Sequence, residues 1–247
     1  MNRWLTCRRR LDAPAIRLYC LPHAGGSAGE YLRWADALPR TEVWGVNLPG
    51  RVPRHDEPPV TDVGDLVGVL VEEVAFAGPY ALFGHSFGGL VAYELAQRLR
   101  GTGREQPDRL VLSGCPPPHV PRALPPVSGL PDEQFLDVVR QRYGPETAAL
   151  LADPDLRDLA LPGFRGDLAA LERYAWPSHP PLDRPLWIVS GDRDELAGRR
   201  LAEWARHTTA ECALRLLPGG HFYFRERPEA MTAALTELLE APAGRPA

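Results

Sequence analysis

The sequence contains no lysine. Its 28 basic residues are all arginines, and together with 32 acidic residues they give a net charge of −4. The absence of lysine excludes a lysine nucleophile and a lysine Schiff base. The small negative charge gives no sign of a nucleic-acid partner, because such proteins usually present clustered positive charge.

Cysteine and long apolar runs are also scarce. The four cysteines form no Cys-x-x-Cys pair and no zinc-spaced cluster with histidine, which predicts free thiols in a reducing compartment and no metal site. They are Cys7, Cys20, Cys115 and Cys212. No apolar stretch of signal-peptide length follows the arginines at 8–10, and no segment approaches the roughly 18 apolar residues of a membrane span. We therefore expect a cytoplasmic protein.

Short apolar runs alternate with helical patterns along the 247 residues. Runs typical of buried strands occur at residues 16–21, 42–48, 79–83, 109–113, 186–190 and 213–217. Apolar residues with helical spacing occur at 31–38, 63–74, 90–99, 198–206 and 231–239. The alternation predicts an α/β fold, with a mostly parallel central sheet and helices on both faces, in one domain over residues 1–247.

The pattern changes between residues 116 and 180. Residues 116–126 are rich in proline and are not expected to form regular structure. Helical patterns at 132–142 and 166–175 follow, with broken sequence between them. We interpret residues 116–180 as an insertion that forms a helical lid, and extra cover for the core is the alternative.

The motif that carries the chemistry is Gly-His-Ser-Phe-Gly-Gly at residues 84–89. It matches Gly-x-Ser-x-Gly, the sharp strand-to-helix turn that exposes a nucleophilic serine in α/β-hydrolases. Positions 84 and 88 must hold small residues such as Gly84 and Gly88, because larger side chains there would collide with the neighbouring strand or helix. The pattern is common by chance, but a predicted strand precedes it and a predicted helix follows it. We therefore predict that Ser86 is a nucleophile.

A serine nucleophile needs a base and an acid that orients the base. In α/β-hydrolases these residues follow the serine in the order acid, then histidine. His221 follows the last predicted strand and is the expected base, with a buried structural histidine as the alternative. Asp194 fits the usual Gly-x-x-Asp spacing after Gly191, while Asp192 and Glu195 stay open as alternatives. His85 neighbours the serine but is expected only to support packing.

The reaction also needs donors for an oxyanion. The backbone N–H of Phe87, the residue after the nucleophile, is the first candidate. The N–H of Ala24, in the loop His-Ala-Gly-Gly at residues 23–26, is the second. An ordinary glycine turn is the alternative interpretation of that loop.

These residues resemble the type II, or stand-alone, thioesterases that serve polyketide and nonribosomal peptide synthases. The matching stretches are residues 20–27, 48–51, 84–89, 110–114, 161–167 (Leu-Pro-Gly-Phe-Arg-Gly-Asp), 191–194 and 218–224. The resemblance implies an acyl-serine mechanism that releases acyl groups from the phosphopantetheine arm of acyl or peptidyl carrier proteins, clearing stalled or misprimed units.

The resemblance also implies the partners. The phosphopantetheine belongs to the carrier protein, so the chain itself is expected to need no cofactor and no metal. Because carrier proteins are generally acidic, arginines near the site could assist encounter, although each is otherwise a plain solvated charge. The candidates are Arg51, Arg54, Arg122 and Arg165. Open alternatives are a carboxylesterase for free esters, a product-releasing thioesterase or acyltransferase, and a non-catalytic binding protein.

Overall fold

The fold is built on a seven-stranded sheet with the strand order β1-β3-β2-β4-β5-β6-β7. The computed structural model describes residues 3–121, 125–150, 153–197 and 200–240. The parallel strands are β2 (Ile16–Leu21), β3 (Thr41–Val46), β4 (Tyr80–His85), β5 (Arg109–Ser113), β6 (Leu186–Gly191) and β7 (Cys212–Leu217). The predicted mostly parallel sheet is confirmed, and the predicted strand ends differ from these by at most two residues.

One strand was not predicted. The edge strand β1 (Leu5–Cys7) pairs antiparallel with β3 and is only partly buried. Three residues are too few to establish an alternating pattern, so the sequence carries no clear signal for it.

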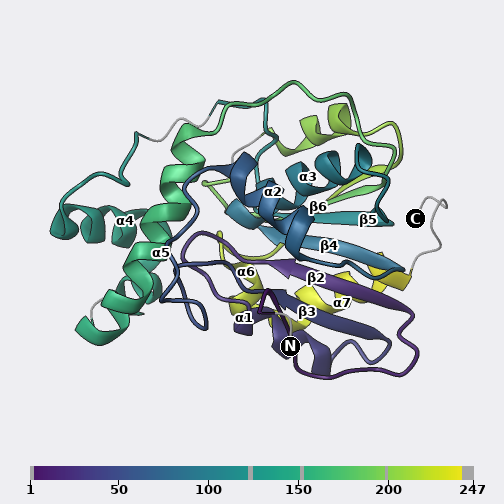
Figure 1. Cartoon of the computed structure of the whole chain (residues 1–247), viewed down its shortest axis with the longest axis horizontal. Coiled ribbons are helices and arrows are strands. Elements are labelled where there is room, and N and C mark those ends of the chain that lie inside the picture. Colours follow the sequence, from purple (N-terminus) through teal and green to yellow (C-terminus); the bar gives the residue numbers. More distant parts are fainter. Residues whose placement is uncertain (1–2, 122–124, 151–152, 198–199, 241–247) are drawn as a thin grey trace.

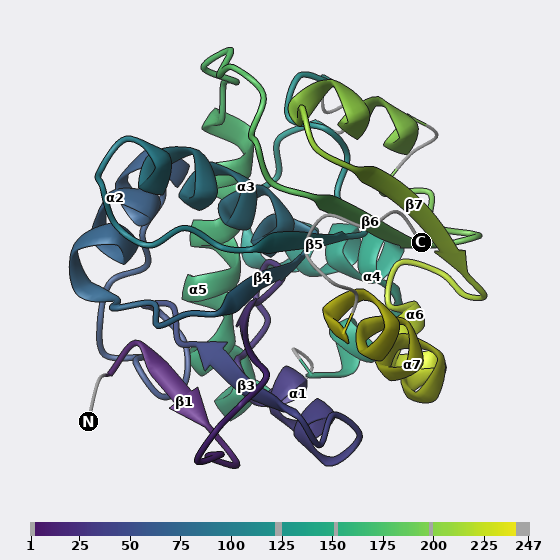
Figure 2. The same cartoon turned by 90° about the vertical axis from the view of Figure 1, so that its right-hand side faces the viewer.

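Helices cover both faces of the sheet (Figure 2). On one face lie α2 (Val63–Glu73) and α3 (Phe87–Arg100). On the other lie α1 (Gly29–Leu32) and α7 (Pro228–Glu240). Each face has its own apolar core, because the buried side of each helix packs on the sheet. There are also shorter elements: the 3₁₀ helices Arg33–Asp36 and Leu201–His207, where longer α-helices were predicted, and the unpredicted α6 (Tyr223–Glu226).

The insertion contains two helices that are longer than predicted. They are α4 (Asp132–Leu150) and α5 (Pro154–Arg173), so much of the stretch we expected to be broken is helical. Pro162 lies inside α5, and the buried Leu161, Phe164 and Leu168 supply packing that outweighs the hydrogen bond a proline removes. The prediction for residues 116–126 is confirmed where they are described, since 116–121 and 125–126 form no helix or strand.

Figure 1 shows α4 and α5 beyond the end of the sheet toward which β2 points. The parallel strands therefore end beneath the insertion. All four cysteines are free thiols, as predicted. Among the described helices, none is long and apolar enough to cross a membrane.

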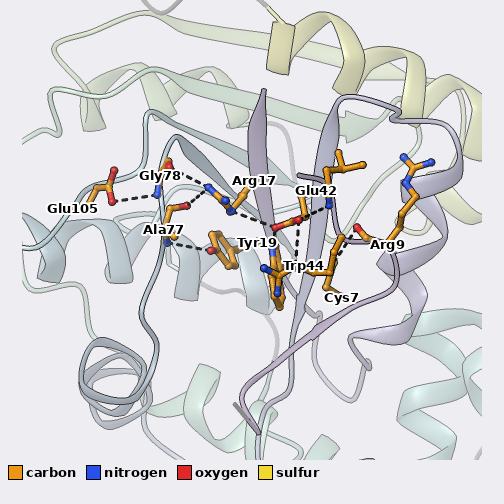
Figure 3. A network of polar contacts seen from close by, with 11 residues as sticks. Cys7, Arg9, Arg17, Tyr19, Glu42, Trp44, Ala77, Gly78 and Glu105 are labelled. Carbon is orange, nitrogen blue, oxygen red and sulfur yellow. Dashed lines mark hydrogen bonds and ion pairs between the residues drawn. The ribbon is translucent and has the colours of Figure 1, made fainter. Parts of the chain in front are cut away.

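A polar network surrounds one buried carboxylate near the opposite end of the sheet, where the strands begin (Figure 3). At its centre the carboxylate of Glu42, in β3, accepts hydrogen bonds from Leu11 N–H (2.8 Å), Trp44 Nε1–H (2.9 Å) and Arg17 Nε–H (3.3 Å). Arg10 adds an ion pair at 3.3 Å. This network ties the chain before β2 to β2 and β3.

Candidate active site

Ser86 lies at the turn between β4 and α3, with a φ of 53° and a ψ of −113°. A side chain on Gly84 would place its Cβ 2.0 Å from the carbonyl oxygen of Gly88. One on Gly88 would lie 2.1 Å from the carbonyl oxygen of Leu21. The steric reason for both glycines is therefore confirmed. A strained conformation of this kind persists only where the surroundings fix it, and it is typical of functional sites.

Asp194 and His221 meet at the carboxyl ends of two neighbouring strands. Asp194 follows β6 and His221 follows β7. The Nδ1 atom of His221 lies 2.9 Å from each carboxylate oxygen of Asp194. A carboxylate at this position holds the imidazole in one orientation and favours the tautomer that leaves Nε2 free to accept a proton.

Asp194 is surrounded by hydrogen-bond donors. Its Oδ1 accepts from the backbone N–H groups of Leu196 and Ala197, both at 3.0 Å, and its Oδ2 accepts from Ser190 Oγ at 3.1 Å. Burial raises the pKa of Asp194, but the hydrogen bond and charge of His221 and the donors from Ala197 and Ser190 outweigh it and lower the pKa below its ordinary value. The carboxylate therefore stays ionised beside the histidine.

The alternative acids lie elsewhere. Asp192 is exposed, and its Oδ1 accepts a hydrogen bond from Gly219 N–H at 2.9 Å, which stabilises the loop after β7. Glu195 is also exposed and lies at the rim of the cavity described below. Of the three carboxylates that the sequence left open, only Asp194 contacts His221 in the described structure.

The second ring nitrogen of His221 is available. Its Nε2 is buried and, among the described residues, has no hydrogen-bond partner. The ring lies 4.7 Å, centroid to centroid, from the ring of His85, which immediately precedes Ser86. No hydrogen bond joins Nε2 to Ser86 Oγ in the described structure, a looseness that is common before substrate binds.

Two further histidines surround this pair, and both are buried. His85 contacts Ser113 Oγ at 2.8 Å and serves packing, as expected. His23 contacts Tyr31 Oη at 3.0 Å. Burial, followed by nearby positive charge, holds the pKa of both well below the ordinary value. Both rings are therefore neutral at neutral pH and do not compete with His221 for a proton.

The two candidate oxyanion donors are unused in the described structure. Phe87 is the first residue of α3, where a backbone N–H has no partner within the helix. Ala24 lies in a turn closed by a hydrogen bond from Gly26 N–H to the carbonyl of His23 at 2.8 Å. Neither N–H donates to an acceptor in the described chain. A helix N-terminus and a free loop amide are groups that stabilise a developing negative charge.

Comparison with known proteins identifies the family of this arrangement. The family model described as Thioesterase domain matches residues 16–240. The chain belongs to this family. The thioesterase is 32% identical to the gramicidin S biosynthesis protein GrsT of Aneurinibacillus migulanus over 244 residues, covering 97% of this chain and 94% of that protein. It is 37% identical to the thioesterase PikA5 of Streptomyces venezuelae over 250 residues, covering 98% and 88%.

A solved structure extends the similarity to three dimensions. The type II thioesterase BorB from the borrelidin biosynthetic cluster superposes with a TM-score of 0.86, at 36% identity, over 96% of this chain and 98% of that one. The predicted α/β-hydrolase fold and the resemblance to type II thioesterases are confirmed. The protein is a hydrolase that acts on thioesters.

The thioesterase has a cavity of about 730 Å³ beside Ser86. The insertion supplies most of its wall, including Val127, Tyr143, Leu168 and Trp176. This size falls within the roughly 300–1,000 Å³ typical of small-molecule sites.

Two further histidines, His119 and His207, contact each other near the cavity. His207 is buried and contacts Tyr93 Oη at 3.1 Å. His119, at the cavity wall, contacts His207 at 2.7 Å and Glu203 at 3.0 Å. Burial first, then the nearby charge of His119, lowers the pKa of His207 to about 4. His119 itself is only partly buried and lies in a stretch that forms no helix or strand.

The predicted arginine patch is wrong for the arginines that the structure describes. Arg51 is buried and paired with Asp167 at 2.6 Å. Arg54 is buried over the ring of Trp4 at 3.7 Å.

The two remaining candidates give no support to the patch either. Arg165 is largely buried and pairs with Asp132 at 2.7 Å. Arg122 lies outside the described residues. The expectation failed because arginine is normally solvated, and sequence spacing does not reveal a partner far along the chain.

Proposed function

We propose that the thioesterase removes acyl groups from the phosphopantetheine arm of acyl or peptidyl carrier proteins, and so clears stalled or misprimed units from a polyketide or nonribosomal peptide synthase. Two observations carry the proposal: the hydrogen-bonded Asp194–His221 pair, whose imidazole lies against the ring of His85 next to Ser86, and the cavity that Ser86 and the insertion line. The type II thioesterase BorB and the biosynthetic protein GrsT, similar over nearly their whole length, support the substrate class.

The reaction begins with Ser86. His221 Nε2 takes the proton of Ser86 Oγ as Oγ attacks the thioester carbonyl carbon. The carbonyl oxygen becomes an oxyanion that accepts hydrogen bonds from the N–H groups of Phe87 and Ala24. When the carbon–sulfur bond breaks, His221 returns the proton to the departing thiolate, and the acyl group stays on Ser86 as an ester.

Hydrolysis repeats the sequence with water. His221 takes a proton from water as the water oxygen attacks the acyl-serine carbonyl. A second oxyanion forms and collapses, the ester bond to Ser86 Oγ breaks, and His221 returns the proton to Oγ. The free acid leaves. Asp194 stays ionised throughout and stabilises the protonated imidazole in both halves.

The insertion acts as a lid in this proposal. Its side chains line the cavity that would hold the acyl group, so they decide which chains fit and how water enters. The phosphopantetheine arm comes with the carrier protein, and the chain contributes no cofactor or metal of its own to the steps above. A cytoplasmic location stays a prediction.

One experiment tests the proposal directly. A panel of carrier proteins loaded with different acyl groups is offered to the enzyme, and the released acids are identified by mass. We expect release from carrier proteins and loss of at least about 10⁴-fold in kcat for Ser86→Ala. Turnover of free nitrophenyl esters without any turnover of acyl-carrier proteins would favour the carboxylesterase instead. Release of cyclic or transferred products would favour the acyltransferase.

A further inference from the structure

The loop at residues 23–26, which carries the candidate oxyanion donor Ala24, is held in place by a helix of the insertion. Three consecutive backbone amides occur in this loop, at residues 24–26. The N–H of Gly26 is used by the carbonyl of His23, and the N–H of Gly25 donates to Oδ2 of Asp167 at 2.8 Å. Asp167 lies in α5, 142 residues further along the chain. Of the three, only the N–H of Ala24 has no acceptor among the residues that the structure describes, and it is left for a substrate.

Asp167 makes this contact as part of a buried ion pair. Its Oδ1 accepts a hydrogen bond from Arg51 at 2.6 Å, and a second nitrogen of Arg51 donates to the carbonyl of Gly26 at 3.2 Å. The two side chains are only 2% and 6% exposed. The pair therefore grips the loop by one N–H and one carbonyl, at neighbouring residues.

The loop also needs this support for conformational reasons. Gly25 has a φ of +72°, and a Cβ there would lie 2.7 Å from Cγ of Phe164 in α5. Helix α5 thus packs directly on the turn, and the left-handed conformation aims the preceding peptide groups. Figure 1 shows α5 across the end of the sheet where this loop emerges from β2.

Stability alone does not explain a charged pair at this position. Desolvation of two buried charges offsets much of their attraction, and apolar residues of similar size are often equally stabilising. Apolar residues cannot, however, accept a bond from Gly25 N–H or donate one to the carbonyl of Gly26. The hydrogen bonds that only a polar pair can make to the loop are therefore what this position requires.

We propose that Asp167 and Arg51 are positioning residues that fix Ala24 N–H as an oxyanion donor, so that the lid helix α5 is coupled to the catalytic chemistry. This inference rests on the proposed function, because it takes Ser86 as the nucleophile. It predicts that loss of the pair weakens transition-state stabilisation much more than it weakens binding of the acyl group.

The test compares two ligands with the same acyl chain. Ser86 Oγ attacks the carbonyl carbon of a trifluoromethyl ketone, and its proton passes to His221. The ketone oxygen becomes an oxyanion, which accepts hydrogen bonds from the candidate donors Phe87 N–H and Ala24 N–H. The matching secondary alcohol fills the same cavity without forming an oxyanion. The ratio of the two inhibition constants therefore reports on the oxyanion donors, and it needs no carrier protein.

Three variants separate positioning from packing. Arg51→Met/Asp167→Leu replaces the pair with apolar groups and should weaken the ketone about 10- to 100-fold, with the alcohol changed less than about 2-fold. Arg51→Met/Asp167→Asn restores an acceptor for Gly25 N–H and should recover part of the loss. Arg165→Gln, the matched control, breaks the Arg165–Asp132 pair of α5 and should leave the ratio unchanged.

The outcomes decide between the alternatives. Equal weakening of ketone and alcohol, or an unchanged ratio in an apolar double variant that melts like the wild type, overturns the positioning role. If the apolar variant does not fold, Asp167→Ala alone is measured, since it removes the acceptor of Gly25 N–H, and an unchanged ratio there is equally decisive against it. A wild-type enzyme that binds the ketone no more tightly than the alcohol would refute Ser86 as the nucleophile, whereas one that prefers the ketone but ignores acyl-carrier proteins would refute only the proposed substrate.

Discussion

Two carboxylates are fully buried at opposite ends of the same sheet. Glu42 lies near the start of β3, and Asp194 lies just beyond the end of β6. In both, burial raises the pKa, and hydrogen bonds and positive neighbours outweigh it, so that each pKa lies below its ordinary value. Burial and ionisation therefore do not distinguish the structural carboxylate from the one in the candidate active site.

Their partners distinguish them. Glu42 faces Arg17 and Arg10, which stay protonated at any accessible pH, together with two N–H donors that exchange no proton. Asp194 faces His221, whose other nitrogen is unpartnered among the described residues. A buried carboxylate contributes to proton transfer only when its partner can both lose and regain a proton. This difference can be tested at each end.

The largest effect is expected from Asp194→Asn. The amide can donate to His221 Nδ1, which would force the tautomer that protonates Nε2 and leaves it unable to accept the serine proton. We expect kcat to fall by about 10⁴-fold with a small change in melting temperature. Hydrolysis of an acyl thioester, with melting followed in parallel, is the measurement. A loss below about 10-fold would mean that another group orients the base.

Glu42→Gln should lower stability and leave kcat nearly unchanged, which is the reverse of the effect expected for Asp194→Asn. It leaves two buried donors and Arg17 imperfectly paired, so we expect a loss of about 1–3 kcal/mol in the free energy of unfolding and a change in kcat of less than about 2-fold. Denaturant unfolding and steady-state kinetics measure both. Arg10→Gln is the matched control: its guanidinium is largely exposed, so its loss should cost less than about 1 kcal/mol. A large kcat effect of Glu42→Gln would remove the contrast between the two ends.

The stabilising effect of Glu42 should also depend on pH. Because its pKa is lower in the folded protein, the unfolded chain binds the proton more readily, and stability is lost as the pH falls. The difference in unfolding free energy between the wild type and Glu42→Gln should therefore be constant near neutral pH and shrink below about pH 4.5, the ordinary value for a glutamate. A difference that does not change between about pH 6 and about pH 3 would contradict ionic pairing in the folded state.

The same contrast explains what the sequence could predict. The strand-to-helix turn at Ser86, the acid after β6 and the histidine after β7 each follow a strand whose apolar pattern is clear. Because these strands are parallel, their ends lie at one edge of the sheet. Short-range spacing even favoured Asp194 over its neighbour Asp192. These features depend on local patterns, and local patterns are what a single sequence carries.

Contacts between distant segments were not predictable in the same way. Arg51 and Asp167 are 116 residues apart, and each belongs to a stretch whose spacing says nothing about the other. Glu42 reads as one polar residue in an apolar strand. The extent of α5 was missed because Pro162 and its neighbouring glycine suggest a break, while the packing that overrides them comes from the rest of the fold.

The smallest effect on kcat is expected from a substitution of Asp192, which lies in the same loop as Asp194 and so allows the two acids to be compared directly. Asp192→Asn removes a charge two residues before Asp194, yet its side chain is exposed and its amide oxygen can still accept the hydrogen bond from Gly219 N–H. We expect kcat to change less than about 2-fold and stability by less than about 0.5 kcal/mol. A loss of kcat approaching that of Asp194→Asn would show that both acids help to orient His221, because Asp192 would then affect catalysis without contacting the histidine.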